Sequence, residues 1–323
     1  MQVKVTIIIP YLNNSPEQLF ILINKIILGK YWPNEILLAY SGKRKLNTPS
    51  LLKKKIKQKR ITFRKIYKKQ MYPGEARNIA IAKCKNNIIG FLDLNTLPDK
   101  KWLYYGYKSI GEKCFIVWGQ FFCEAISFTE KIIRASTLGS RVYKSIPGTI
   151  LYRRVFKECG KFIENIRAGE DGDWQNRAYL HQIKNKVNNN LLKYNGFQNK
   201  DFLQILKKWF TYYSHSKNLL HLRNQKNYYY WVVTIILIIA AYNWNALIAN
   251  WQMNSPKYIP NITKITFFSI CITYLLIRGI IFPLVKKERV RFIFPFNFLV
   301  ITIFSFFLDI IKYLSFLNLK IKK

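Results

Sequence analysis

The stretch "NIIGFLDLN" (Asn87–Asn95) joins an apolar run to two polar residues, Asp93 and Asn95. Residues Ile88–Leu92 are apolar without interruption, which is typical of a strand buried on both faces of a sheet. The run ends on an acid, although the chain has only 16 Asp and Glu residues against 53 Lys and Arg. We therefore expect Asp93 at the carboxyl end of a central strand, where α/β sheets bind their ligands.

Strand and helix patterns alternate along the first half of the chain. Runs of β-branched and apolar residues predict strands at Val3–Pro10, Glu35–Gly42, Ile61–Ile66 and Asn87–Asp93. Between them, helical periodicity predicts helices over Pro16–Leu28, Pro49–Lys59 and Gly74–Cys84. Ser15 is the expected N-cap of the first helix, with Pro16 at its first position. This order predicts an α/β domain whose mostly parallel sheet is flanked by helices.

The composition changes near residue 228, where long apolar blocks replace the mixed pattern. Tyr228–Trp251 and Ile262–Val285 each contain about 20 mostly apolar residues, enough to cross a bilayer. Aromatic residues at both ends of the first block suit the two membrane interfaces. A third stretch, Phe292–Leu308, is shorter and carries Pro and Asn, so a span, a re-entrant segment and an interfacial helix all remain open. These blocks predict an α-helical membrane region with two or three transmembrane helices.

The segment 201–227 alternates aromatic or Leu residues with Lys, His and Arg. This composition predicts an amphipathic helix lying in the plane of the lipid headgroups, and a helix packed on the soluble domain fits equally well. The expected organisation is an α/β domain at residues 1–200, an interfacial linker helix at 201–227 and a membrane region at 228–323.

The loop "KKERVR" (Lys286–Arg291) between the second and third apolar stretches is strongly basic. By the positive-inside rule this loop is cytoplasmic, and the first domain is then cytoplasmic as well. The five cysteines are scattered and include no C-x-x-C pair, which fits a reducing compartment and argues against structural zinc. We expect an integral protein of a prokaryotic inner or plasma membrane.

The formal net charge of +37 raises the question of nucleic-acid binding. No zinc-finger or RNA-binding motif accompanies the charge, and the chain is rich in Lys, Asn, Ile, Tyr and Phe together, which indicates a general compositional bias. We therefore expect no nucleic-acid partner. The positive charge favours an anionic membrane surface instead.

Four features in a fixed order resemble a known family. They are "VTIIIPYLNN" (Val5–Asn14), a stretch that begins "YPGEARN" and ends "LPDKKWL" (Tyr72–Leu103), the segment from "GTILYRR" to "GEDGDWQNR" (Gly148–Arg177), and the apolar blocks behind them. Together they resemble the family-two glycosyltransferases of the GT-A, or nucleotide-diphosphosugar transferase, fold. The similarity covers roughly residues 3–185.

The resemblance implies a site for a nucleotide-diphosphosugar donor and a divalent cation, Mg²⁺ or Mn²⁺. The D-x-D motif of the family matches Asp93 and Asn95, so an amide replaces the carboxylate that commonly binds the metal. An amide oxygen is a weaker ligand, and the implied metal site is weakened accordingly. The implied donor-binding residues are Pro10, Tyr11, Ser41, Arg77, Asn78 and Asp93.

The acidic pair Glu170–Asp171 matches the pair that supplies the family's catalytic base. The resemblance implies that Asp171 takes the proton of the acceptor hydroxyl, with inversion at the sugar carbon, while Glu170 orients a substrate. Acids favoured by the dipole at a helix N-terminus are the alternative explanation of this cluster. Asp173 and Arg177 have the spacing of a helical ion pair.

The function implied is a membrane-anchored, inverting glycosyltransferase that acts on a lipid-linked or cell-surface glycan acceptor. Two alternatives stay open. A processive polysaccharide synthase would carry Q-x-x-R-W, from which "QILKKW" (Gln204–Trp209) departs in spacing and in its Lys. A non-catalytic membrane protein on a degenerate scaffold would explain Asn95. The segment after the second strand, "LLAYSGKRK" (Leu37–Lys45), lacks the acid that often reads the nucleobase, so the nucleotide is not identified.

Overall fold

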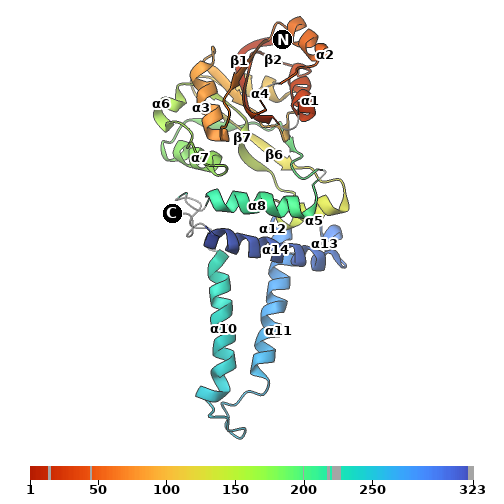
Figure 1. Cartoon of the computed structure of the whole chain (residues 1–323), viewed down its shortest axis with the longest axis vertical. Coiled ribbons are helices and arrows are strands. Elements are labelled where there is room, and N and C mark those ends of the chain that lie inside the picture. Colours follow the sequence, from red (N-terminus) through yellow and green to blue (C-terminus); the bar gives the residue numbers. More distant parts are fainter. Residues whose placement is uncertain (14–15, 44–45, 199, 217–218, 220–226, 319–323) are drawn as a thin grey trace. The chain divides into compact units, whose positions relative to one another are not determined.

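The computed structural model describes the chain except for residues 14–15, 44–45, 199, 217–218, 220–226 and 319–323. The described residues form two compact units (Figure 1). The first unit contains Met1–Ile126 and Arg141–His221, and the second contains Ser127–Ser140 and Leu222–Lys323. The short segment 127–140 thus belongs with the C-terminal part of the chain, which the sequence pattern did not indicate.

A nine-stranded sheet forms the centre of the first unit within the described residues. Its strands are β1 (Gln2–Asn13), β2 (Trp32–Gly42), β3 (Thr62–Tyr67), β4 (Ile88–Phe91), β5 (Thr96–Leu97), β6 (Ile116–Cys123), β7 (Tyr143–Tyr152), β8 (Asn185–Val187) and β9 (Leu192–Tyr194). The spatial order is β3-β2-β1-β4-β7-β6-β9-β5, and β8 pairs with β6.

The first four strands are parallel, and the later strands make the sheet mixed. β1 pairs in parallel with both β2 and β4, and β2 pairs in parallel with β3. β7 is antiparallel to β4 and β6, and β5 is antiparallel to β9. The α/β class and the four predicted strands are therefore confirmed. In the C-terminal half, β5 and β7 run against their neighbours, while β6 pairs in parallel with β8 and β9.

Helices cover both faces of this sheet (Figure 1). The elements are α1 (Pro16–Ile27), α2 (Ser50–Gln58), α3 (Pro73–Lys83), α4 (Trp102–Ser109), α6 (Val155–Cys159), α7 (Glu170–Leu180) and α8 (Phe202–Ser216). One hydrophobic core lies between the sheet and α1, α2 and α4, and a second lies between the sheet and α3, α6 and α7. The predicted N-cap Ser15 falls outside the described residues.

The segment predicted as an interfacial linker contains α8, and this helix is part of the first unit. Ile205 and Leu206 of α8 are buried, whereas Leu203 remains exposed. The inner face of α8 therefore packs on the protein, and the interfacial position of this segment stays a prediction.

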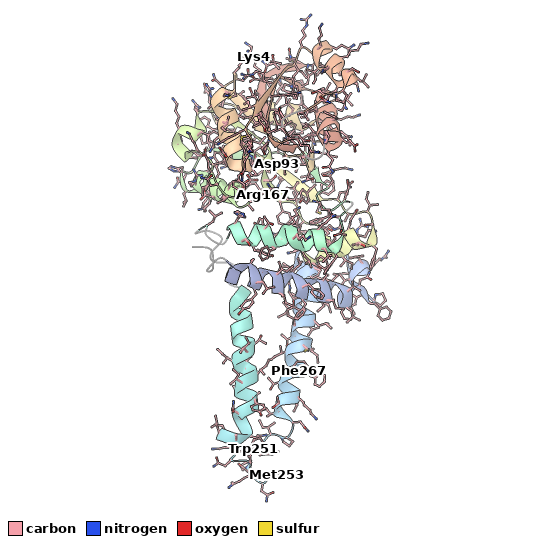
Figure 2. All side chains as sticks on the ribbon, viewed as in Figure 1. Lys4, Asp93, Arg167, Trp251, Met253 and Phe267 are labelled. Carbon is pink, nitrogen blue, oxygen red and sulfur yellow. The ribbon has the colours of Figure 1, made fainter. Side chains whose placement is uncertain are left out.

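Helices joined by loops make up the second unit, which has no strand among its described residues. It comprises α5 (Phe128–Ser136), α10 (Asn227–Leu247), α11 (Ile262–Leu275), the π-helical turn η1 (Leu276–Ile281), α12 (Phe282–Val285), α13 (Val290–Ile293) and α14 (Asn297–Asn318). Ile262–Val285 and Asn297–Ser315 are long and apolar enough to cross a membrane. The third apolar helix thus starts and ends later than the predicted stretch Phe292–Leu308. Figure 2 shows Phe267 on α11 and Trp251 near the loop between α10 and α11.

Candidate active site

Arg77 joins three of the predicted site residues. Its Nη1 donates to Glu170 Oε1 at 3.0 Å and to Asp171 Oδ1 at 2.7 Å, and its Nη2 donates to Asp93 at 3.1 and 3.3 Å. The side chain of Arg77 is only 1% exposed. Residues 93 and 171, which are far apart in the chain, therefore meet through one guanidinium group.

Helix α3 positions Arg77 because its buried face is made of small residues. Pro73 stands at the start of this helix, and Gly74, Ala76 and Ala80 are buried along it. A Cβ on Gly74 would lie 2.2 Å from the backbone oxygen of Ile163, so the close approach of α3 to that segment depends on glycine. The longer side chain of Arg77 can then run beside the sheet to its carboxyl edge.

Two further contacts hold α3 to the segment that precedes α7. The ring of Phe162 lies 5.4 Å from the Arg77 guanidinium carbon. Asn78 donates to Phe162 O at 2.9 Å and to Glu164 Oε1 at 2.8 Å, and it accepts from Phe162 N at 3.0 Å. The Asn78 amide is thus engaged within the protein, where it holds this segment against α3.

Asp93 lies just beyond the end of β4, in a turn fixed by Thr96. The Thr96 hydroxyl accepts from Asp93 N at 3.1 Å and donates to Asp93 O at 2.8 Å. A third of the Asp93 side chain is exposed, so a ligand can reach it. Asn95 is half-buried in the same turn, and its backbone oxygen accepts from Asn195 N at 3.0 Å.

Glu170 and Asp171 begin α7, directly after Gly169. Gly169 has φ +98°, a left-handed conformation that favours glycine, and it turns the chain sharply into the helix. The Glu170 side chain is 6% exposed and that of Asp171 is 32% exposed. Asp173 pairs with Arg177 one turn further on, at 2.8 Å. Of these three acids, Glu170 and Asp171 face Arg77.

The surroundings of Glu170 and Asp171 raise the pKa of both carboxyl groups. For Asp171, burial raises the pKa well above its usual value, the charges of Glu170 and Asp93 add to this effect, and Arg77 opposes it. Burial also raises the pKa of Glu170, although the positive charge of Arg77 acts to lower it. For Arg77, the three carboxylates outweigh burial and raise the pKa. A carboxyl group with a raised pKa accepts a proton more readily than an ordinary one.

Pro10, Tyr11 and Ser41 lie at the carboxyl ends of β1 and β2. Pro10 stands opposite Ala39 and Leu12 stands opposite Ser41 in the parallel pairing, and Tyr11 and Ser41 are both 4% exposed. These residues share an edge of the sheet with Asp93, because β4 lies in parallel beside β1. Figure 2 shows Asp93 and Lys4 at opposite ends of the sheet. The three residues line this edge, while the Arg77 cluster itself is built from α3, α7 and the turn after β4.

Helix α8 contributes Lys208, already singled out in the sequence as the Lys of "QILKKW", and Tyr212, which was not singled out there. Lys208 donates to Tyr194 Oη at 2.6 Å, and burial lowers the pKa of Lys208 to about 8. Burial and the charges of Glu170 and Asp171 raise the pKa of Tyr212, so this phenol is close enough to interact electrostatically with both carboxylates. The amphipathic pattern of 201–227 and the motif "QILKKW" had pointed to this helix, but which of its residues face the cluster depended on the fold.

The donor set at the sheet edge fits a sparsely ligated Mg²⁺ or Mn²⁺. Among the described residues, no group of three or more His, Cys, Asp or Glu side chains is arranged to hold a metal ion. Asp93 has a partly exposed carboxylate, which also accepts from Arg77, and Asn95, two residues further on, has an amide oxygen that could serve as a neutral ligand. Mg²⁺ is commonly held by one or two carboxylates together with substrate phosphates, so this pair is sufficient only when a diphosphate completes the shell.

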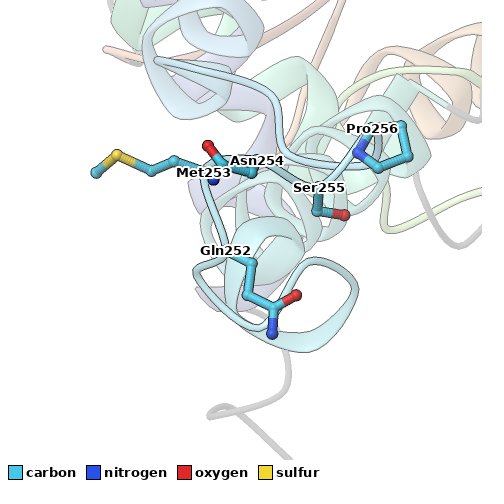
Figure 3. A pocket seen from close by; sticks show the side chains of 5 residues that line it. All are labelled: Gln252, Met253, Asn254, Ser255 and Pro256. Atoms are coloured by element: carbon cyan, nitrogen blue, oxygen red, sulfur yellow. The ribbon is translucent and has the colours of Figure 1, made fainter.

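A pocket outside this cluster lies in the loop between α10 and α11 (Figure 3). Its lining residues are Gln252, Met253, Asn254, Ser255 and Pro256. The lining is uncharged, so it has nothing with which to neutralise a diphosphate. The candidate site therefore remains the Arg77 cluster.

This sheet, with an acid after β4 and an acidic pair at the start of α7, defines a GT-A-type transferase domain. Residues 6–164 match the family model described as Glycosyl transferase family 2. The first part of the chain is thus similar to glycosyltransferase family 2 over just under half of the chain's length, and apolar helices follow it. A search of curated proteins finds no match.

Solved structures with the same fold include several transferases. Mannosyltransferase PcManGT from Pyrobaculum calidifontis, in complex with GDP-Man and Mn²⁺, has a TM-score of 0.50 at 11% identity over 100% of this chain and 89% of that chain. S. aureus TarS 1–349 has a TM-score of 0.43 at 12% identity, over 88% of each chain. At these identities the likeness concerns the fold alone.

Proposed function

We propose that this protein is a membrane-anchored, inverting glycosyltransferase of the hexosyltransferase type. It would transfer a sugar from a nucleotide-diphosphosugar to a lipid-linked or cell-surface glycan acceptor. The observation that carries the proposal is the shared guanidinium of Arg77, which holds Asp93 of the implied donor site beside Glu170 and Asp171. The family match supports the reaction class.

In the proposed reaction, the acceptor hydroxyl oxygen forms a bond to the anomeric carbon of the sugar. The bond from that carbon to the diphosphate oxygen breaks, and its electron pair leaves with the nucleoside diphosphate. Asp171 takes the hydroxyl proton, for which its raised pKa and partial exposure suit it. Attack from the face opposite the leaving group inverts the configuration. Buried Glu170 would orient a substrate.

Donor binding is assigned to Pro10, Tyr11, Ser41, Arg77, Asn78 and Asp93. Asp93 and Asn95 would hold a divalent cation, which supplies positive charge to the diphosphate when it is bound. The mannosyltransferase with the same fold was solved with GDP-Man and Mn²⁺, which supports a nucleotide-sugar and a divalent cation here. We assign no nucleic-acid partner.

Membrane anchoring is supported by three apolar helices of the second unit. Ile262–Val285 and Asn297–Ser315 are long and apolar enough to span a bilayer, and α10 carries the shorter apolar stretch Thr234–Leu247 among its described residues. The basic loop Lys286–Arg291 would lie on the cytoplasmic side, which places the catalytic domain in the cytoplasm. This arrangement suits an acceptor carried on a lipid, because the acceptor and the enzyme then share one membrane surface.

The deciding experiment uses the purified full chain and a panel of UDP-, GDP- and dTDP-sugars, with and without Mn²⁺. A donor that binds the folded protein is expected to raise its melting temperature, and the same donor should be hydrolysed slowly in the absence of an acceptor. Asp171→Asn should retain donor binding and lose roughly 10²- to 10⁴-fold in turnover. Asp173→Asn, on the same helix but paired with Arg177, is the matched control and should retain most of its activity. Donor binding without any turnover would favour the non-catalytic alternative.

A further inference from the structure

Helix α14 lies across the other apolar helices of the second unit. Figure 1 shows α10 and α11 side by side, with α14 running crosswise at the end of α11. By length and hydropathy alone, α14 is as suitable for spanning a membrane as Ile262–Val285. Two helices at such an angle cannot both cross the same bilayer, because one of them must then lie near its plane.

The crossing is close and fixed by specific contacts. A Cβ on Gly279 of η1 would lie 2.3 Å from Thr302 Oγ1 and 2.7 Å from Phe298 O, so only glycine permits this approach. Asp309 accepts from Tyr274 Oη at 2.8 Å and from Arg278 Nη2 at 3.0 Å. The carboxylate of α14 is therefore neutralised by the cation of η1, which ties the two elements together.

The buried face of α14 is covered by protein. Ile301, Phe304, Leu308 and Ser315 are buried, at the spacing of one helical face. The backbone oxygen of Ile301 accepts from Ser136 Oγ of α5 at 3.4 Å. Contacts with α5 and η1 thus account for this side of the helix.

The exposed face of α14 is apolar along its length. It consists of six large side chains, each 40–59% exposed: Leu299, Val300, Ile303, Phe306, Phe307 and Leu314. These positions recur at helical spacing on the side away from Ile301 and Phe304. A helix facing water would present polar residues there, so this face requires an apolar neighbour.

We propose that α14 is an in-plane helix whose exposed apolar face lies in the acyl boundary of the bilayer that α10 and α11 cross, an inference that rests on the proposed membrane anchoring. The lipid is favoured as the occupant because the exposed surface of α11 is also apolar, for example at Phe267 and Ile272. One bilayer covers both surfaces without another protein. The basic residues Lys286–Arg291, just before α14, supply charge for anionic headgroups at that level.

Depth-dependent quenching tests this assignment on the full chain in lipid vesicles. In a Cys271→Ser background, a cysteine replaces either Phe307, at the centre of α14, or Ile272, at the centre of the span Ile262–Val285. Each is labelled with a fluorophore and exposed to lipids that carry a quencher near the headgroup or near the end of the acyl chain. The side chains of Phe307 and Ile272 are 43% and 58% exposed, so the replacements remove little buried surface. The background chain without an added cysteine measures any labelling of the four buried cysteines.

At Phe307→Cys, the shallow quencher is expected to remove more fluorescence than the deep one. At Ile272→Cys the order is reversed. Preferential deep quenching at both positions would overturn the proposal, because α14 would then span the bilayer. Quenching at Ile272→Cys alone would also overturn it and would point to a second copy or another protein over α14. Absence of quenching at both would refute the membrane anchoring itself, and this proposal with it.

A reporter fused after Lys323 gives a second reading that does not depend on cysteine substitution. An in-plane α14 keeps the end of the chain on the same side of the membrane as the first unit. A fusion that is active on the opposite side would contradict the proposal.

Discussion

Arg77 carries one positive charge that three carboxylates share. Its guanidinium group is fully buried, and each of its two terminal nitrogens contacts a carboxylate. When all three acids are ionised, the cluster holds an excess of negative charge, which attracts a proton or a metal ion. Burial is the main reason why the pKa of Asp171 is raised even though it contacts an arginine, and this excess of negative charge adds to the effect.

We predict that Arg77→Lys moves the acidic limb of the pH–activity profile to higher pH. Lysine keeps the charge but cannot contact Asp93 and Asp171 together as the planar guanidinium does. With less opposition from the cation, the pKa of Asp171 rises further. A base acts only when deprotonated, so activity that is lost as pH falls is then lost at a higher pH. Arg177→Lys, in the Asp173 pair, is the control, and an unmoved limb in Arg77→Lys would contradict the prediction.

A second prediction concerns the stability cost of Glu170. Its pKa is raised in the folded protein, so folding binds the proton more tightly and stability declines as pH rises above the usual carboxyl value of about 4.3. Glu170→Gln removes this effect and should melt at a higher temperature than the parent chain at pH 7. The difference should shrink as the pH approaches about 4. Thermal melts across this range measure it, with the exposed Glu112→Gln as the control. A lower melting temperature for Glu170→Gln at pH 7 would refute the argument.

The predictability of the elements depended on whether their contacts were local. The strands of the parallel half and the position of Asp93 at a strand end follow from apolar runs and turn residues near them in the sequence. The antiparallel β7 did not, because its partners β4 and β6 are chosen by long-range pairing. Arg77 could be placed near a donor by resemblance, but its contact with α7 depends on the packing of α3 against Ile163. Likewise, α8 gave an amphipathic pattern without saying which face would meet Tyr194.

At the level of α3, we predict that Gly74→Ala impairs both stability and turnover. The added methyl group would meet the backbone oxygen of Ile163, so the helix must shift, at a cost of about 1–3 kcal/mol. Arg77 would move with the helix, away from Asp93 or Asp171. Gly111→Ala is the matched control, since a Cβ there meets nothing within 4 Å. Denaturant melts and donor hydrolysis check both effects, and similar behaviour of the two variants would disprove the packing argument.

At the scale of the whole molecule, the chain enters the second unit twice. The segment 127–140 forms α5, whose Arg134 contacts the carboxylate of Glu288 at 2.7 and 2.9 Å. The Glu288 side chain is completely buried. This ion pair therefore links two parts of the second unit that are 154 residues apart in the sequence.

We predict that Glu288→Gln loosens α5. A buried ion pair that loses one charge is destabilised by about 3–5 kcal/mol, because the remaining charge lacks its partner. Amide hydrogen exchange over residues 128–136 should become faster. Arg289→Gln removes a neighbouring exposed charge and should leave that exchange unchanged. Equal exchange in the two variants would show that the pair does not hold the segment.

The double entry of the chain also decides how a free catalytic fragment should be made. A chain cut before residue 222 would still carry α5, with Ile132 and Ile133 deprived of the helices that now bury them. The exposed apolar side chains of α5 would then make the fragment prone to aggregation, even if its sheet folds correctly. Excising residues 127–140 and bridging the gap with a short polar linker removes this exposed apolar surface, and we expect the resulting first unit to be purified without detergent.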